Sequence, residues 1–175
     1  MIRFDVSALT KARLGMSLTL NVDTGPQSLT DGSTEPSGRG LAEVLKVDFL
    51  RGTIQVIRIQ TGLLVQGTVE SQLGLECVRC LESFVFPITL ELEETFRLPG
   101  ASLRPDVAYA VSDDGWLDLT PLLREQSWVA IPMKPLCRPD CKGLCPRCGA
   151  NLNLESCTCE SMEVDPRLAL LKDLL

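Results

Sequence analysis

The feature that most constrains the fold is a long alternation of apolar and polar residues between positions 63 and 98. Period-two alternation over this length predicts antiparallel strands with one dry face. Only Glu94 interrupts the apolar phase of the second half. Strands this long must bend, and we expect the curvature at Gly67 and Gly74. The apolar phase consists of Leu63, Val65, Val69, Leu73, Leu75, Phe84, Phe86, Ile88, Leu90, Leu92, Phe96 and Leu98.

Two cysteines, Cys77 and Cys80, lie between the two halves of this pattern, which places them at the tip of a long hairpin. A C-x2-C spacing lets one short turn direct two thiolates at a tetrahedral ion. The chain has eight cysteines and no histidine, so a metal site built on them must be all sulfur. The six other cysteines lie in one downstream stretch: Cys137, Cys141, Cys145, Cys148, Cys157 and Cys159.

Eight sulfurs make two four-sulfur sites, and two divisions are open. We favour the division with one short-range site, because closing a short loop costs less entropy than closing a long one. That division assigns Cys77, Cys80, Cys137 and Cys141 to site 1, and Cys145, Cys148, Cys157 and Cys159 to site 2. The rival division places Cys137, Cys141, Cys145 and Cys148 on one ion. Zinc is favoured over iron, although four thiolates accept either metal.

Disulfides and a redox dithiol are the other uses of paired cysteines. The chain begins at Met1 without a basic segment followed by an apolar run, so we expect no signal peptide and a cytoplasmic location. Cytosolic thiols stay reduced, which favours a metal over disulfides. A thioredoxin-type motif would open a helix, whereas a strand pattern follows Cys80.

The remaining segments complete a mainly β fold of the α+β class. We expect a bent antiparallel sheet or partly open barrel in residues 1–134, with a covering helix at about 121–131. Residues 135–175 would add the cysteine-rich metal-binding segment and a short C-terminal helix, and the whole would form one structural unit. No apolar run approaches the roughly 20 residues that span a bilayer, so no membrane contact is expected.

Local signals place the smaller elements. Thr120 and Pro121 have the residue types of a helix cap and first helical position, and Pro132 ends that helix. Gly-, Pro- and Ser-rich residues 24–40 indicate a solvated loop. The strand pattern at 41–60 is broken at Arg51-Gly52 into two strands or a bulged one. The helix residues expected to cover the sheet are Leu119, Leu122, Leu123, Trp128 and Val129.

The formal net charge is −6, which argues against nucleic-acid binding by the surface as a whole. Residues 82–118 hold eight acids and two arginines, and this acidic flank is either a solvated surface or a docking site for a basic partner. Four cations interrupt the trend near the cysteines. They either offset the negative metal–thiolate centres, which we favour, or contact a partner: Lys134, Arg138, Lys142 and Arg147.

Five short motifs are specific in combination: Leu75-Glu-Cys-Val-Arg-Cys-Leu-Glu, Ile131-Pro-Met-Lys-Pro-Leu-Cys, Cys141-Lys-Gly-Leu-Cys-Pro-Arg-Cys-Gly, Asn151-Leu-Asn and Asp165-Pro-Arg-Leu-Ala. Together they resemble one family, the YceD large-ribosomal-RNA accumulation proteins of bacteria and chloroplasts. The resemblance implies a role in 23S rRNA accumulation or processing. It also implies a large-subunit ribosomal protein, the precursor ribosome or 23S rRNA as partner, and no small-molecule substrate. Some family members lack most of these cysteines, which implies that the metal supports the fold.

Two other functions are weighed against a non-catalytic assembly factor. A zinc hydrolase or nuclease would need an open coordination position, which four thiolates do not leave. Without histidine, Glu76 or Glu82 near the hairpin tip would have to act as the base. A thiol-based metal or redox sensor would use Cys157 and Cys159.

Overall fold

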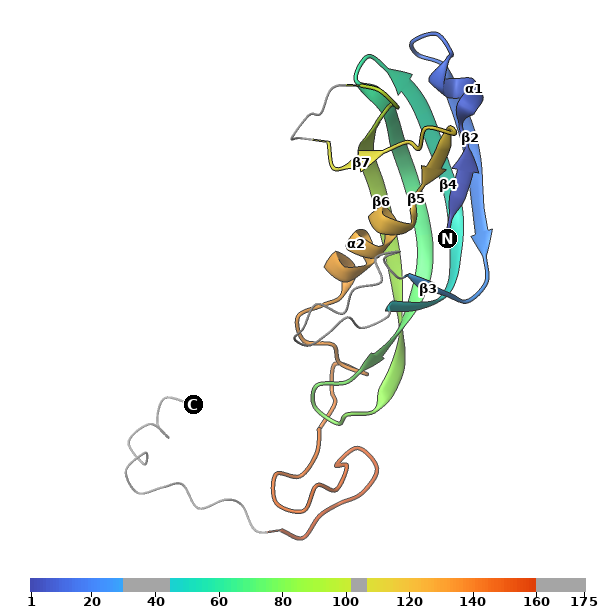
Figure 1. Cartoon of the computed structure of the whole chain (residues 1–175). Coiled ribbons are helices and arrows are strands. Elements are labelled where there is room, and N and C mark those ends of the chain that lie inside the picture. The colour runs from blue at the N-terminus through green and yellow to red at the C-terminus, as the bar shows by residue number, and fades with distance from the viewer. Residues whose placement is uncertain (30–44, 102–106, 160–175) are drawn as a thin grey trace, which may run out of the picture.

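The computed structural model describes residues 1–29, 45–101 and 107–159. Its elements run along the chain from a short N-terminal strand to a covering helix (Figure 1). They are β1 (Arg3–Asp5), α1 (Ser7–Thr10), β2 (Ser17–Thr24), β3 (Gln27–Leu29), β4 (Leu45–Ile59), β5 (Gly62–Glu76), β6 (Ser83–Arg97), β7 (Tyr109–Ala110), β8 (Trp116–Asp118) and α2 (Thr120–Ala130). The predicted C-terminal helix lies outside the described residues.

The main sheet is built on three strands of 15 residues each, β4, β5 and β6. Its order is β2-β4-β5-β6-β7, and β3 pairs beside β4. All pairings are antiparallel except that of the two-residue β7, which runs parallel to β6. Strands β1 and β8 form a separate antiparallel pair. The predicted fold class is confirmed as a bent, mainly β sheet with a covering helix; in the described ranges this sheet is open, not closed into a barrel.

The β5–β6 hairpin confirms the antiparallel strands predicted from the alternation in the sequence. Its register pairs Val69 with Leu90 and Leu73 with Phe86, so the apolar phases of both strands share one face. That face joins α2 and the β1–β8 pair in one core, while the opposite phase is mostly exposed. Burying each large apolar side chain there contributes roughly 1.5–3 kcal/mol. Glu94, the residue out of phase, is half-buried opposite Val65.

Glycine is required where β4 and β5 approach most closely. A Cβ on Gly67 would lie 2.3 Å from the Thr53 carbonyl oxygen, and one on Gly52 would lie 2.1 Å from the Thr68 carbonyl oxygen. At Gly74, by contrast, a Cβ would meet nothing within 4 Å. Gly67 is thus a position where only glycine fits, whereas Gly74 is not, and the curvature expected at both residues stays a prediction.

The interruption expected at Arg51-Gly52 does not occur at that position of β4. The strand runs unbroken through that position, and its register shift falls between Val47 and Leu50. The buried Ser71 hydroxyl donates a 2.6 Å hydrogen bond to the Phe49 carbonyl oxygen inside the irregular stretch. The irregularity thus lies where a side chain satisfies the displaced carbonyl group. The expected loop at 24–40 also contains β3, whose Leu29 is buried.

Helix α2 covers the sheet with its first turns. Leu119, Leu122 and Leu123 are fully buried, whereas Val129 is 81% exposed. Ala130 at the end of the helix and Ile131 after it still pack against the core, and Trp128 and Ile131 line a hollow together with residues of β4 and β5. The expectation that Val129 covers the sheet was therefore wrong, whereas Trp128 is 37% exposed and lies beside β4 and β5.

The start of α2 also differs from the expected cap. Asp118 Oδ1 accepts the backbone N–H of Thr120 at 2.9 Å, and no side chain caps the helix from Leu119. The Thr120 hydroxyl instead accepts the backbone N–H of Ile2 at 2.9 Å. The Thr120 hydroxyl therefore binds the residue before β1, and the Asp118 carboxylate accepts a backbone N–H at the start of the helix. Among the described residues no helix is long and apolar enough to span a membrane.

Candidate metal centre

The tip of the β5–β6 hairpin is a tight turn that holds two sulfurs inward. The backbone N–H of Leu81 donates to the Cys77 carbonyl at 2.9 Å, and that of Cys77 donates to the Glu82 carbonyl at 3.0 Å. Leu81 adopts a left-handed conformation with φ 58°, which non-glycine residues adopt at a cost. The turn buries both thiols, leaving Cys77 0% and Cys80 4% exposed.

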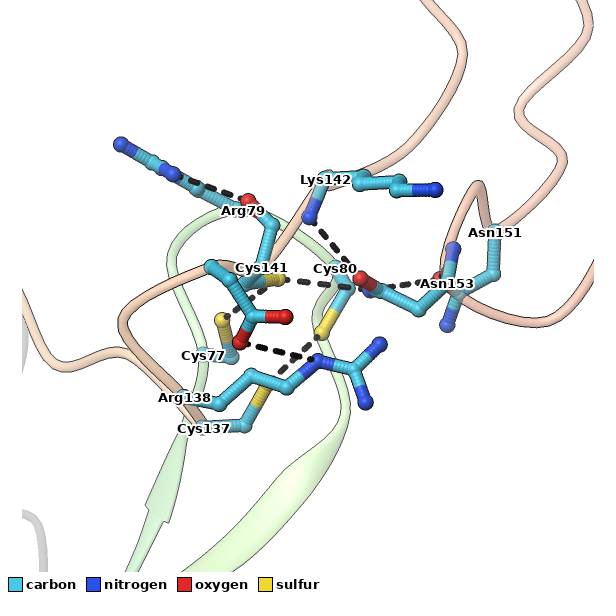
Figure 2. Close-up of polar contacts among 10 residues, drawn as sticks. Cys77, Arg79, Cys80, Cys137, Arg138, Cys141, Lys142, Asn151 and Asn153 are labelled. Atoms are coloured by element: carbon cyan, nitrogen blue, oxygen red, sulfur yellow. Dashed lines mark hydrogen bonds and ion pairs between the residues drawn. The ribbon is translucent and has the colours of Figure 1, made fainter.

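The segment after α2 brings two further sulfurs to this tip (Figure 2). Cys77 and Cys141 have their Sγ atoms 3.8 Å apart, and those of Cys80 and Cys137 are 3.6 Å apart. All four sulfurs lie within 4.8 Å of one another, and all are free thiols. A tetrahedral zinc ion with 2.3 Å bonds holds its sulfurs about 3.8 Å apart. The first cluster, Cys77, Cys80, Cys137 and Cys141, is thus compatible with zinc in both donor chemistry and spacing.

Hydrogen bonds from the side chain and backbone of the turn hold the tip against the cysteine-rich segment. The Arg79 guanidinium donates to the Cys141 carbonyl at 2.8 Å, and the Leu144 N–H donates to the Arg79 carbonyl at 3.0 Å. The Val78 N–H donates to the Pro135 carbonyl at 3.0 Å. Phe84 and other apolar residues pack around the sulfurs. The hairpin tip and residues 135–144, which are far apart in the sequence, therefore meet at one cluster, in which Cys77, Cys80 and Cys141 are buried.

The second cluster belongs to the loop that ends the described chain, and in Figure 1 this loop lies below the tip of the β5–β6 hairpin. Its four sulfurs, from Cys145, Cys148, Cys157 and Cys159, again lie within 4.8 Å of one another. The Gly149 N–H donates to the Cys145 carbonyl at 2.9 Å, with φ 72° at Gly149. This repeats the turn at Leu81 with the residue type that the conformation favours. Cys145 is buried, but Cys148 and Cys159 are exposed.

The eight sulfurs are thus grouped in the structure as in the favoured division, and not as in the rival one. Cys145 and Cys148 lie with the C-x-C pair that follows them. Cys137 and Cys141 lie with the hairpin tip.

Each cluster contains one thiol that ionises easily. Burial acts to raise the pKa of Cys77, but backbone N–H groups of Cys137, Cys80 and Arg79 outweigh it and lower that pKa to about 6. Backbone N–H groups of Cys148 and Arg147 lower the pKa of Cys145 to about 6. N–H donors aimed at sulfur favour the thiolate, which is the form that binds a metal.

The neighbouring thiols of each cluster behave in the opposite way. Burial, with hydrogen bonds to Cys80 and Cys141, raises the pKa of Cys137 to about 12. A hydrogen bond to Cys148 and, to a smaller extent, burial raise the pKa of Cys159 to about 12. Each metal-free cluster therefore resists collecting several negative charges, and a divalent cation is the species that would relieve this repulsion.

The four predicted partner-contacting cations are all exposed, one just before the cysteine-rich segment and three within it: Lys134, Arg138, Lys142 and Arg147. Arg138 forms a 3.7 Å ion pair with Asp140. Lys142 contributes its backbone N–H to the site while its side chain extends away from the sulfurs (Figure 2). The structure thus places these cations around the clusters, and their role as partner contacts stays a prediction.

The candidate general bases lie beside the turn. Glu76 and Glu82 are both exposed, and Glu82 contributes its backbone carbonyl to the turn. A role for either carboxylate in catalysis stays a prediction.

One residue of the site had no assigned role in the sequence. Asn153 Nδ2 donates a 3.3 Å hydrogen bond to Cys141 Sγ. The signal available was Asn151-Leu-Asn153, since asparagines in loops form local hydrogen bonds to backbone groups. That pattern predicts a turn but not its proximity to a sulfur.

Together these features define a class of protein: a mainly β domain whose longest hairpin is joined to a cysteine-rich segment by sulfur groups suited to structural metal. Comparison with known families is more specific. The family described as "Large ribosomal RNA subunit accumulation protein YceD" matches residues 65–175, a range that contains both clusters. The chain belongs to the YceD family.

Similar proteins occur in bacteria and plants. An uncharacterized protein of Mycobacterium tuberculosis is 32% identical over 154 residues, covering 84% of this chain and 73% of the relative. The uncharacterized protein YlbN of Bacillus subtilis is 29% identical over 109 residues, covering 62% of this chain and 63% of the relative. "Large ribosomal RNA subunit accumulation protein YCED homolog 1, chloroplastic" of Zea mays is 28% identical over 143 residues, covering 64% of this chain and 49% of the relative. No solved structure matches this chain significantly.

Proposed function

We propose that this protein is a non-catalytic factor of ribosome biogenesis that supports the accumulation of large-subunit (23S) rRNA. The observation that carries this proposal is the family match over residues 65–175. The maize and Arabidopsis relatives bear the same description in their names. A role in the bacterial cytoplasm accords with the bacterial relatives.

Structural zinc on the two clusters is part of this proposal. Four sulfurs fill a tetrahedral coordination shell, so a zinc ion held by either cluster would have no open position for water or substrate. An ion on the first cluster would fix the hairpin tip against residues 137–141, and one on the second would close the loop between Cys145 and Cys159. This supports a scaffold over the alternative of a zinc hydrolase or nuclease. A metal-bound oxygen ligand seen by X-ray absorption would favour the hydrolase.

The partner that we propose is a basic large-subunit ribosomal protein. The sheet face opposite the core carries exposed acids, Glu70 on β5 and Glu91 and Glu93 on β6. Asp23 on β2 forms an ion pair with Arg51, with 3.6 Å between Oδ1 and Nε. A surface of this sign attracts a cationic protein and repels the phosphates of RNA. We name it the acidic sheet face.

Depletion of the protein in its host should lower the ratio of 23S to 16S rRNA, measured on total RNA. A tagged copy should then capture a basic large-subunit ribosomal protein, and capture should persist after ribonuclease treatment. Charge reversal by Glu91→Lys with Glu93→Lys should weaken the capture, whereas the control Glu155→Lys, outside the face, should not. An unchanged rRNA ratio on depletion would refute the biogenesis role. An electrophoretic shift with isolated 23S rRNA at physiological salt would refute the choice of partner.

A further inference from the structure

The side chain of Asn153 connects the two cysteine clusters. Asn153 belongs to the loop of the second cluster, because it lies between Cys148 and Cys157. Its Nδ2 nevertheless donates to the Sγ of Cys141 in the first cluster, at 3.3 Å (Figure 2). A sulfur of one cluster is therefore in contact with the loop that the other cluster closes.

The orientation of this amide is fixed by its other partners. Asn153 Oδ1 accepts the backbone N–H of Lys142 at 2.8 Å, which only an oxygen can do. The nitrogen must then face Cys141 and Asn151, whose Oδ1 accepts from Nδ2 at 2.9 Å. One amide hydrogen thus serves Asn151 and the other serves the sulfur. These three contacts determine which way the Asn153 amide faces.

The loop that carries Asn153 is attached to both clusters. The Leu152 N–H donates to the Gly143 carbonyl at 2.9 Å, and the Cys145 N–H donates to the Ala150 carbonyl at 2.8 Å. A further isolated bridge joins Leu144 to Asn151. The sulfurs of the second cluster lie before and after this loop, so an ion there would fix both of its ends.

We propose that Asn153 is a positioning residue for a metal ion on the first cluster, and that through it the two clusters load cooperatively. This rests on the metal binding proposed above. An N–H donor to a ligand sulfur stabilises its thiolate form and orients it. An ion on the second cluster closes the loop, holds Asn153 in place and so raises the affinity of the first. By linkage the first ion raises the affinity of the second by the same factor.

The expected size follows from comparable outer contacts of metal ligands, whose loss weakens binding roughly 10- to 100-fold. Asn153→Ala should therefore weaken zinc at the first cluster by such a factor. Asn153→Asp keeps the acceptor for Lys142 but replaces the N–H donor with a negative oxygen beside a thiolate. It should weaken binding at least as much. Leu154→Ala is the matched control, because Leu154 is in the same loop and 73% exposed.

The two clusters have the same donors, so the test must read each cysteine separately. Full-length metal-free protein would be equilibrated in chelator-buffered zinc, the free thiols alkylated, and the protection of every cysteine measured by mass spectrometry. Circular dichroism of the same samples would show that the variants remain folded. The zinc concentration that half-protects Cys77 and Cys80 gives the affinity of the first cluster.

The cooperative step is tested by removing the second cluster. Cys145→Ser with Cys148→Ser should weaken zinc at the first cluster roughly 10- to 100-fold, and should add little further weakening in the Asn153→Ala background. Equal first-cluster affinity in wild type and Asn153→Ala would overturn the positioning role. Weakening by Asn153→Ala but none by loss of the second cluster would overturn the cooperativity. If zinc protects none of the eight cysteines, the proposed metal binding itself would be overturned.

Discussion

The two clusters should differ in how much of the protein they stabilise, and serine pairs can separate them. Cys77→Ser with Cys80→Ser removes the first cluster, whose shortest loop between the hairpin pair and the later pair runs from Cys80 to Cys137, 57 residues along the chain. Cys145→Ser with Cys148→Ser removes the second, in which nine positions separate Cys148 from Cys157. The entropic cost of closing a loop grows as 1.5RT ln n, so an ion on the first cluster restricts the unfolded chain by about 1.6 kcal/mol more.

The measurement is urea unfolding of both variants in saturating zinc, followed by far-UV circular dichroism. We expect the first-cluster variant to lose at least about 1.6 kcal/mol more of the free energy of unfolding than the second-cluster variant. In metal-free protein the ion-dependent part of this difference should disappear, which makes the stripped proteins the internal control. An equal or larger loss for the second-cluster variant in zinc would refute the idea that the first cluster clamps the fold.

Three further predictions concern the hairpin and the thiols of the two clusters. Gly67→Ala should destabilise the protein by about 2 kcal/mol or more because its Cβ meets a backbone carbonyl, whereas Gly74→Ala should be neutral or stabilising by up to about 1 kcal/mol; equal urea midpoints would contradict this. Leu81→Gly should raise the melting temperature, because glycine relieves a left-handed conformation costing roughly 1–2 kcal/mol, and a lower melting temperature would count against that strain. With the pKa values of Cys77 and Cys145 near 6, their thiolates are present above pH 6 and lost below it. One more proton per cluster must then be displaced, so the fall of zinc affinity with decreasing pH should steepen below pH 6 in chelator competition; a constant slope through pH 6 would argue against the two lowered pKa values.

The sheet was predictable because its signal is periodic and repeated. Alternation through β5 and β6 is long enough to fix the buried face, and the C-x2-C between them fixes where the turn must be. The grouping of sulfurs could be ranked by loop length, since entropy favours short closures. These inferences depend on local pattern alone.

The parts that were missed depend on contacts between distant residues. Strand β3 has only three residues and lies in a Gly- and Pro-rich stretch, so its pairing with β4 leaves little local trace. Thr120 has the residue type of a cap, but the N-terminal strand uses its hydroxyl. The contact of Asn153 with Cys141 spans 12 positions and two clusters. No periodicity encodes it.

The claim on which the proposed architecture depends is that sulfur-bound ions join the hairpin tip to the cysteine-rich segment. The most direct measurement is elemental analysis of the purified full-length protein combined with X-ray absorption at the metal edge. We expect two zinc ions per chain, each with four sulfurs at about 2.3 Å and no lighter ligand. Metal-free protein of unchanged stability, or an ion with oxygen or nitrogen in its first shell, would contradict the claim.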